Sequence, residues 1–316
     1  MEVAAQNNKV FKLYLDLPTE LQLMLIDNME SGDRSQFKLC SKLCNEEVKA
    51  SKSYIYGLKL HAHYVNILKM DVLYAKSGNG YKLEFKNEGG KNYEIFRNLK
   101  NEEFRRTELE RDVDLIQYGK EHFQRILQFY QNGIKKLTIS GEDFDMDSRI
   151  RSLNNLEELE VKGGFDILKV FSKLRNPLKK LYIHGRENSE ILVNCEEMYQ
   201  VQNKLTIYQV QLNSEQFTRL SAYNINMSIG CLTEQDICNF ITSWQNGTLG
   251  KEIGVYKWRI FGSDFEIRQL MSLLEIRISR ANVCIFRIKH AKNAEKYGRL
   301  RCNRYEISFS DLKNVV

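Results

Sequence analysis

The sequence predicts an α+β protein with an N-terminal helical segment, a small antiparallel meander and an α/β solenoid with parallel strands. Three observations predict this fold class. Short amphipathic runs lie between residues 17 and 48, polarity alternates between 53 and 105, and a leucine pattern recurs every 22 residues from 134 onward. We therefore expect three segments, with the bounds 1–50, 51–111 and 112–316.

The N-terminal segment predicts two short helices. Pro18 suits the first turn of a helix from about Thr19 to Met29, because its missing N–H has no partner to lose there. Asp33 stands where the N-cap of a second helix belongs. The apolar edge of that second helix consists of Phe37, Cys40, Ser41 and Cys44. Helices this short cannot bury a core alone, so we expect them to need a partner or a following domain.

The second segment has the alternation of β-strands. Residues 54–56, 81–85 and 93–96 alternate in polarity, and glycine pairs at 78–80 and 89–90 stand between them as turns. This pattern predicts an antiparallel meander that joins the N-terminal helices to the rest of the chain.

The third segment begins with a helix and continues as a repeat. A helix from about Asp112 to Gln131 leads into a strand, and the pattern Leu/Ile-x-x-Leu-x-Ile/Val then occurs three times. Leu137, Leu159 and Leu181 occupy the same position in successive copies, each 22 residues after the last. That period is typical of a leucine-rich repeat with one strand and one helix per turn. Looser copies follow at 205–207 and 225–227, and strands at 283–285 and 305–309 would cap the open end.

Helices between the strands are predicted by apolar stripes at helical spacing. These stripes begin at Ile167, Ile237 and Ile267. Thr233 with Asp236, and Ser263 with Glu266, have the spacing of polar caps at helix starts. We interpret the stripes as packing surfaces that face the sheet.

Two motifs carry a resemblance to a known family. Leu17-Pro18-x-Glu20-Leu21 with the amphipathic runs behind it resembles an F-box. The stretch 231–244, Cys-Leu-Thr-x-x-x-Ile-Cys-Asn-Phe-Ile-x-x-Trp, resembles the large nematode F-box families that carry an F-box-associated domain. The departure from the family pattern is Cys44, at a step where the family often has Trp.

The resemblance implies a non-catalytic adaptor subunit of a Skp/cullin/F-box ubiquitin ligase. It implies that a Skp-type adaptor, and through it a cullin, is bound by Leu17, Pro18, Glu20, Leu21, Leu25, Ile26 and Met29. The solenoid would then hold a protein target. An ordinary helical hairpin packed on its own domain is the alternative interpretation of the N-terminal stretch, and a structural scaffold with a vestigial F-box is another.

The repeat also predicts a candidate substrate face. Residues between the buried positions of each strand face outward from the core, and three strands supply nine of them. These are Lys136, Thr138, Ser140, Glu158, Glu160, Lys162, Lys180, Tyr182 and His184. Tyr182 and His184 are the best candidates, because aromatic groups dominate binding hot spots. Opposite charges on neighbouring strands can equally be mutual stabilisation, which contributes only about 0.2–1 kcal/mol per pair.

The charge distribution supports a competing function. The chain carries a net charge of +6, and residues 277–304 hold nine Lys or Arg against the single acid Glu295. With the aromatic residues between them, these charges fit a nucleic-acid or anionic-surface binder. Basic residues that keep terminal strand edges from aggregating are the alternative that we favour, so we expect no nucleic-acid partner.

The sequence lacks the motifs of enzymes, metal sites, membrane helices and secreted proteins. No metalloprotease, hydrolase or phosphate-loop motif occurs, and His61-x-His63 lacks further ligands nearby, so we expect no catalytic site, cofactor or metal. No run approaches the roughly 18 apolar residues of a membrane helix, and the first residues lack the apolar core of a signal peptide. We expect seven reduced cysteines and a cytoplasmic or nuclear location.

Overall fold

The chain forms two compact units in a computed structural model. Unit 1 comprises Met1–Lys136 with Asp147–Leu156, and unit 2 comprises Leu137–Met146 with Glu157–Val316. Besides Leu25, Ile26, Met29 and Phe37, the structure describes residues 55–63, 67–74, 80–99, 102–141, 146–163, 166–184, 194–208, 212–228, 232–260, 265–276, 283–293 and 295–312.

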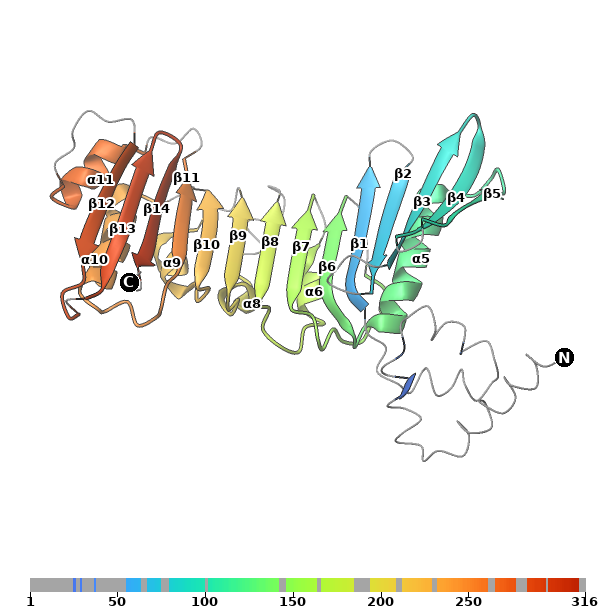
Figure 1. Cartoon of the computed structure of the whole chain (residues 1–316), viewed down its shortest axis with the longest axis horizontal. Coiled ribbons are helices and arrows are strands. Elements are labelled where there is room, and N and C mark those ends of the chain that lie inside the picture. Colours follow the sequence, from blue (N-terminus) through green and yellow to red (C-terminus); the bar gives the residue numbers. More distant parts are fainter. Residues whose placement is uncertain are drawn as a thin grey trace. The chain divides into compact units, whose positions relative to one another are not determined.

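Unit 1 contains an antiparallel meander, as the alternation predicts. Its strands are β1 (Ile55–His63), β2 (Ile67–Leu73), β3 (Gly80–Glu88), β4 (Lys91–Asn98) and β5 (Phe104–Leu109), paired in chain order (Figure 1). Leu68, Met70 and Phe85 point to one face and are fully buried. The predicted antiparallel meander is confirmed.

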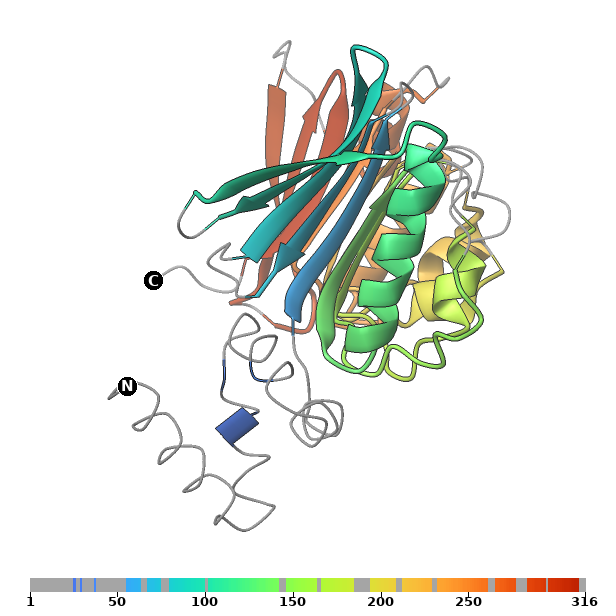
Figure 2. The same ribbon diagram turned by 90° about the vertical axis from the view of Figure 1, so that its right-hand side faces the viewer.

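The helix α5 (Leu115–Tyr130) covers the buried face of the meander (Figure 2). Its N-cap is Asp114, whose carboxylate accepts hydrogen bonds of 3.0 Å from the backbone N–H groups of the first turn. Gly119 lets the helix approach, because a Cβ there would lie 2.7 Å from the Leu68 side chain. The helix therefore belongs to the same compact unit as the meander, whereas the sequence places a boundary between residues 111 and 112.

Unit 2 begins with the strands of the repeat. They are β6 (Ile134–Ser140), whose first residues belong to unit 1, β7 (Glu158–Lys162), β8 (Lys180–His184), β9 (Lys204–Tyr208) and β10 (Asn224–Ser228). Leu159 lies opposite Leu181, and Leu181 lies opposite Leu205, in parallel pairing. The expectation of parallel strands is confirmed from β7 to β10. The 22-residue period sets Leu159 beside Leu181, and the looser copies keep Leu205 and Ile225 in the same register.

The C-terminal part of unit 2 differs from the predicted parallel solenoid. Strand β11 (Val255–Arg259) pairs in parallel with β10 and antiparallel with β14 (Glu306–Leu312), which continues antiparallel to β13 (Tyr297–Asn303) and then β12 (Val283–Lys289). A tight turn accounts for the antiparallel pairing of β13 with β14. The Asn303 side chain accepts hydrogen bonds from the N–H groups of Tyr305 and Glu306 at 2.8 and 2.9 Å, so β13 and β14 form a hairpin.

Short helices cover one face of the unit 2 strands, and the other face carries none of the described helices (Figure 2). They are α6 (Ile167–Phe171), α8 (Glu196–Tyr199), α9 (Ser214–Arg219), α10 (Glu234–Gln245) and α11 (Ile267–Leu273). The predicted stripe of α10 is buried, and its Phe240 stacks on Tyr256 with ring centroids 4.9 Å apart. Trp258 and Phe309 complete an aromatic core beneath this helix.

The helix caps confirm one predicted signal and correct another. Thr233 and Asp236 form the predicted capping box, with each side chain accepting from the other's backbone N–H at 3.3 and 2.8 Å. In α11 the N-cap is Glu266, whose side chain makes no capping bond, and Ser263 lies outside the described residues. The described helix begins at Ile267, so Glu266 stands at the N-cap itself and not inside the first turn, where the predicted cap would place it.

The predicted N-terminal helices lie almost entirely outside the described residues. Leu25 and Ile26 are helical, and the Met29 N–H donates to the Ile26 carbonyl at 3.1 Å. Met29 and Phe37 pack against Ile26, which is 0% exposed. The apolar residues of the two predicted runs thus meet in a small cluster.

The close packing of Gly298 gives a stability prediction. A Cβ on this β13 residue would lie 2.5 Å from the Phe309 ring and 2.9 Å from the Trp244 ring, and both rings are buried and rigid. We expect Gly298→Ala to lower the free energy of unfolding by about 1–3 kcal/mol, because the rings must shift. Urea denaturation followed by circular dichroism measures this loss.

Gly57 is the matched control for that substitution. It is also buried in a strand, but a Cβ added there would have its nearest neighbours, in Leu73 and Lys136, 3.6 and 3.7 Å away. We expect Gly57→Ala to be neutral or to stabilise by up to about 1 kcal/mol, since it restricts the unfolded chain. Equal destabilisation by the two substitutions would contradict the packing at Gly298.

Candidate interaction surface

The open face of unit 2 carries most of the predicted substrate face. On β7 and β8 the buried leucines, isoleucine and valine point to the helices, so the residues between them point away. Lys180 Nζ lies 2.6 Å from a Glu158 carboxylate oxygen, and Lys162 Nζ lies 2.9 Å from Glu160. These four charges neutralise each other across and along the strands. They therefore offer little uncompensated charge to a partner.

Aromatic side chains form the centre of this face. The rings of His184 and Tyr208 lie 5.0 Å apart, and Lys204 Nζ lies 5.3 Å from the Tyr182 ring centroid. Burial, with Lys162 nearby, lowers the pKa of His184 below its ordinary value, so its imidazole is neutral at neutral pH. Burial likewise raises the pKa of Tyr182. This cluster suits contact with rings and apolar groups.

Thr138 corrects the predicted exposure of the face. Its side chain is only 2% exposed, and its hydroxyl has no hydrogen-bond partner among the described residues. Thr206 is buried in the same way, between Tyr182 and Asn226 on the neighbouring strands. A short side chain on a sheet is covered by longer neighbours, whichever face it points to. Ser140 and the unit 1 residue Lys136 are half-buried.

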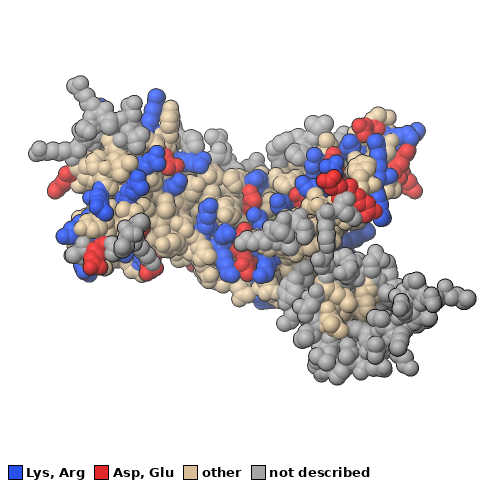
Figure 3. Space-filling view, viewed as in Figure 1, with Lys and Arg blue, Asp and Glu red and all other residues tan. Residues whose placement is uncertain are grey.

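The open face of β11–β14 is basic. Lys257 and Arg259 lie on β11, Arg287 and Lys289 on β12, and Arg299 and Arg301 on β13. Figure 3 shows blue Lys and Arg side chains spread over this end of unit 2. The sequence indicates the charges on β12 and β13 within 277–304, but not that β11 joins them. In the sequence, the position of Lys257 and Arg259 on the open face is indicated by their alternation with Tyr256 and Trp258, which are buried.

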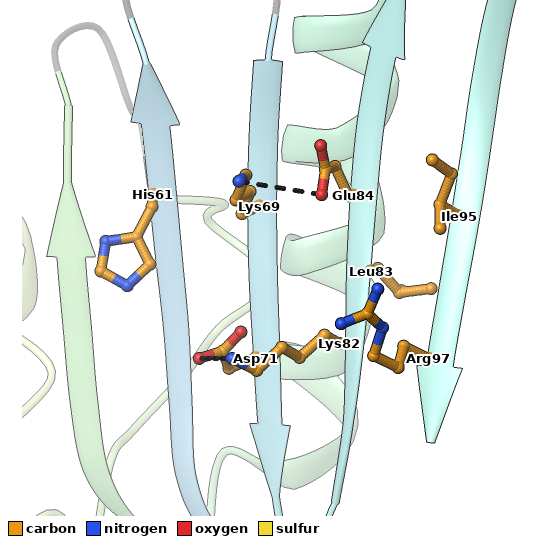
Figure 4. Close-up of a pocket in the computed structure, with 8 residues that line it drawn as sticks. All are labelled: His61, Lys69, Asp71, Lys82, Leu83, Glu84, Ile95 and Arg97. Carbon is orange, nitrogen blue, oxygen red and sulfur yellow. Dashed lines mark ion pairs between the residues drawn. The ribbon is translucent and has the colours of Figure 1, made fainter. Parts of the chain in front are cut away.

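The open face of the meander has its own hollow of about 450 Å³. Figure 4 shows its residues, which come from β1 to β4 and include His61. Cross-strand ion pairs occupy it, with Lys69 3.7 Å from Glu84 and Lys82 3.9 Å from Asp71. The described residues contain no group of three His, Cys, Asp or Glu that could hold a metal ion, and the side chain of His63 lies outside the described part of the chain.

The predicted adaptor contact falls mostly outside the described residues, which exclude Leu17, Pro18, Glu20 and Leu21. Leu25 is 45% exposed on its helix, whereas Ile26 is buried against Met29 and Phe37. Within the predicted contact, Ile26 would therefore hold the two runs together and Leu25 would face a partner.

Comparisons with protein-family models, with curated proteins and with solved structures found no match to this chain. None of the helices in the described ranges is long and apolar enough to cross a membrane.

Proposed function

We propose that this chain is the target-binding subunit of a Skp/cullin/F-box ubiquitin ligase in the cytoplasm or nucleus. Residues 17–48 would bind a Skp-type adaptor, and the open face of unit 2 would hold a protein target. The observation that carries the proposal is the Leu17-Pro18-x-Glu20-Leu21 motif at the head of two short amphipathic runs. The resemblance of residues 231–244 to F-box families with an F-box-associated domain supports the target-binding role of unit 2.

Two structural features support the proposal. Ile26, Met29 and Phe37 pack together, which is the arrangement expected if the two runs form one small helical unit. Leu25 keeps nearly half of its side chain in solvent, as an apolar contact residue would before its partner binds. Because helices as short as those predicted here cannot bury a core alone, we expect this unit to gain most of its order from an adaptor.

The proposed mechanism is proximity. The adaptor and cullin would bring a conjugating enzyme to the complex, and unit 2 would hold the target nearby. The effective concentration of target lysines at the reactive thioester would rise without any catalytic group in this chain. A sheet face with polar and aromatic side chains, rather than a deep pocket, suits this task.

Affinity purification of the tagged chain tests the proposal. We expect a Skp-type adaptor to copurify with the unaltered chain, and Leu21→Asp combined with Pro18→Ala to remove it, because a carboxylate would enter an apolar contact. Lys69→Gln, on the open face of the meander, is the control that should leave recovery unchanged. If no Skp-type protein copurifies, or if the double variant recovers it equally well, the proposal is wrong.

A further inference from the structure

The arginines of β12 and β13 all lie on the face opposite the helices. Leu300 and Cys302 are buried toward the helices, so Arg299 and Arg301 point away from them. Ile288 of β12 is also buried toward the helices. Its neighbours Arg287 and Lys289 therefore lie on the open face, which carries none of the described helices. The basic face consists of Lys257, Ile285, Arg287, Lys289, Arg299 and Arg301.

The arginines of the basic face are not compensated by acids within the described part of the sheet. Arg287 lies directly opposite Arg299, whose other neighbour is Ser310, and Arg301 lies between Ile285 and Ser308. Among the described residues, none of these three arginines forms an ion pair, whereas Lys257 Nζ lies 4.0 Å from a Glu306 carboxylate oxygen. Like charges directly opposite each other destabilise a sheet. An anionic partner would relieve this repulsion between the arginines.

Other strand pairs of the same chain have that compensation. Lys69 faces Glu84 and Lys82 faces Asp71 across β2 and β3, in direct register. Lys180 faces Glu158 across β7 and β8 in the same way. These pairs show that cations elsewhere on the sheet lie directly opposite acids, whereas Arg287, Arg299 and Arg301 do not.

Protection of a sheet edge does not explain them. Basic side chains on an edge strand prevent edge-to-edge association, which accounts for Arg287 and Lys289 on β12, the last described strand in the order. Strand β13 is an inner strand, paired with β12 on one side and β14 on the other. Arg299 and Arg301 have no edge to protect, so they point to a ligand.

The other groups on this face favour a peptide over a nucleic acid. Arg287 stacks 4.5 Å from the Tyr297 ring centroid on this face, and in the adjoining turn Arg304 lies 5.6 Å from that of Tyr305, so each ring already carries a cation where a base would stack. Ile285 is 54% exposed between Arg287 and Arg301. An apolar side chain surrounded by guanidinium groups matches an apolar residue flanked by carboxylates.

We propose that the basic face binds an acidic segment of a protein partner, in which an apolar residue is flanked by Asp or Glu. The carboxylates would accept hydrogen bonds from Arg299, Arg301 and Arg287, and the apolar residue would cover Ile285. This proposal rests on the proposed function, because it names the class of target that unit 2 would hold.

Fluorescence anisotropy with the purified full-length chain tests the inference. The probe is a labelled peptide in which a central Leu is flanked on both sides by Glu. We expect saturable binding that weakens as salt rises, and about a tenfold or greater loss of affinity in Arg299→Gln with Arg301→Gln. Ile285→Ser should also weaken binding, without changing the salt dependence.

The matched control removes two cations from a compensated face. Lys69→Gln with Lys82→Gln should leave peptide affinity within about twofold, because those lysines already pair with acids. An equal loss in both double variants, or no binding of the acidic peptide, would overturn the inference. Binding of a single-stranded oligonucleotide in preference to the peptide would overturn it in favour of nucleic acid. The assay contains no adaptor, so adaptor copurification without peptide binding removes only this inference, and the reverse removes only the proposed ligase function.

Discussion

Replacing Trp258 with Ala should lower the free energy of unfolding by about 3–5 kcal/mol. The Trp258 side chain is 0% exposed and lies at the centre of the aromatic core of unit 2. Its ring centroid is 5.8 Å from that of Phe240 and 6.1 Å from that of Phe217, which joins β11 to α10 and α9. The substitution would leave a cavity that these rigid rings cannot fill. Urea denaturation followed by far-ultraviolet circular dichroism measures the loss.

Tyr305→Ala is the control for this effect. Tyr305 is another large aromatic residue of unit 2, but it lies exposed in the turn between β13 and β14. Its removal should change stability by no more than about 0.5 kcal/mol. If Trp258→Ala cost as little as Tyr305→Ala, the aromatic core would not be the main packing contact of this unit.

Lys296→Met should destabilise the chain by roughly 3 kcal/mol or more. Lys296 Nζ lies 2.8 Å from an oxygen of Asp311, whose side chain is 1% exposed on the helix side of β14. Without Lys296, the carboxylate is a buried charge with no ion pair to another described residue. The loss in thermal or urea denaturation checks this expectation.

A second substitution separates the buried charge from lost packing. Asp311→Asn in the Lys296→Met background removes the stranded charge, so it should recover part of the lost stability. Arg219→Met is an exposed comparison, since its ion pair with Glu196 lies on the surface, and its loss should cost no more than about 1 kcal/mol. If the double variant were no more stable than Lys296→Met alone, the buried-charge explanation would fail.

The repeat was the most predictable part of the fold. A fixed period places equivalent residues at the same height on successive parallel strands, so Leu159 opposite Leu181 follows from the sequence alone. The adjacency of Glu158 and Lys180 follows for the same reason, and it is confirmed by their ion pair. The helix stripe from Ile237 to Trp244 was equally clear, because four apolar residues at helical spacing leave one face to bury.

Strand direction was not predictable from the alternation. The run from Tyr305 to Phe309 has the same polarity pattern in a parallel or an antiparallel strand, and only the tight turn after Asn303 decides between them. The burial of Thr138 had no signal either. It depends on the length of neighbouring side chains, and alternation indicates only the face to which a residue points.

The basic face was visible in the sequence only as a count of charges. The sequence indicates an excess of Lys and Arg between 277 and 304, but not that Arg299 lies on an inner strand opposite Arg287. That placement requires the strand order, in which β13 lies between β12 and β14. Strand order is set by long-range pairing, which a single sequence does not encode locally.

Titration calorimetry of the purified chain with a purified Skp-type adaptor tests the proposed adaptor function most directly. We predict saturable binding by the unaltered chain, loss of binding in Leu21→Asp, and retained binding in Arg299→Gln with Arg301→Gln, whose charges belong to unit 2 and not to the proposed adaptor contact. Absence of binding by the unaltered chain, or equal binding by Leu21→Asp, would contradict the adaptor function.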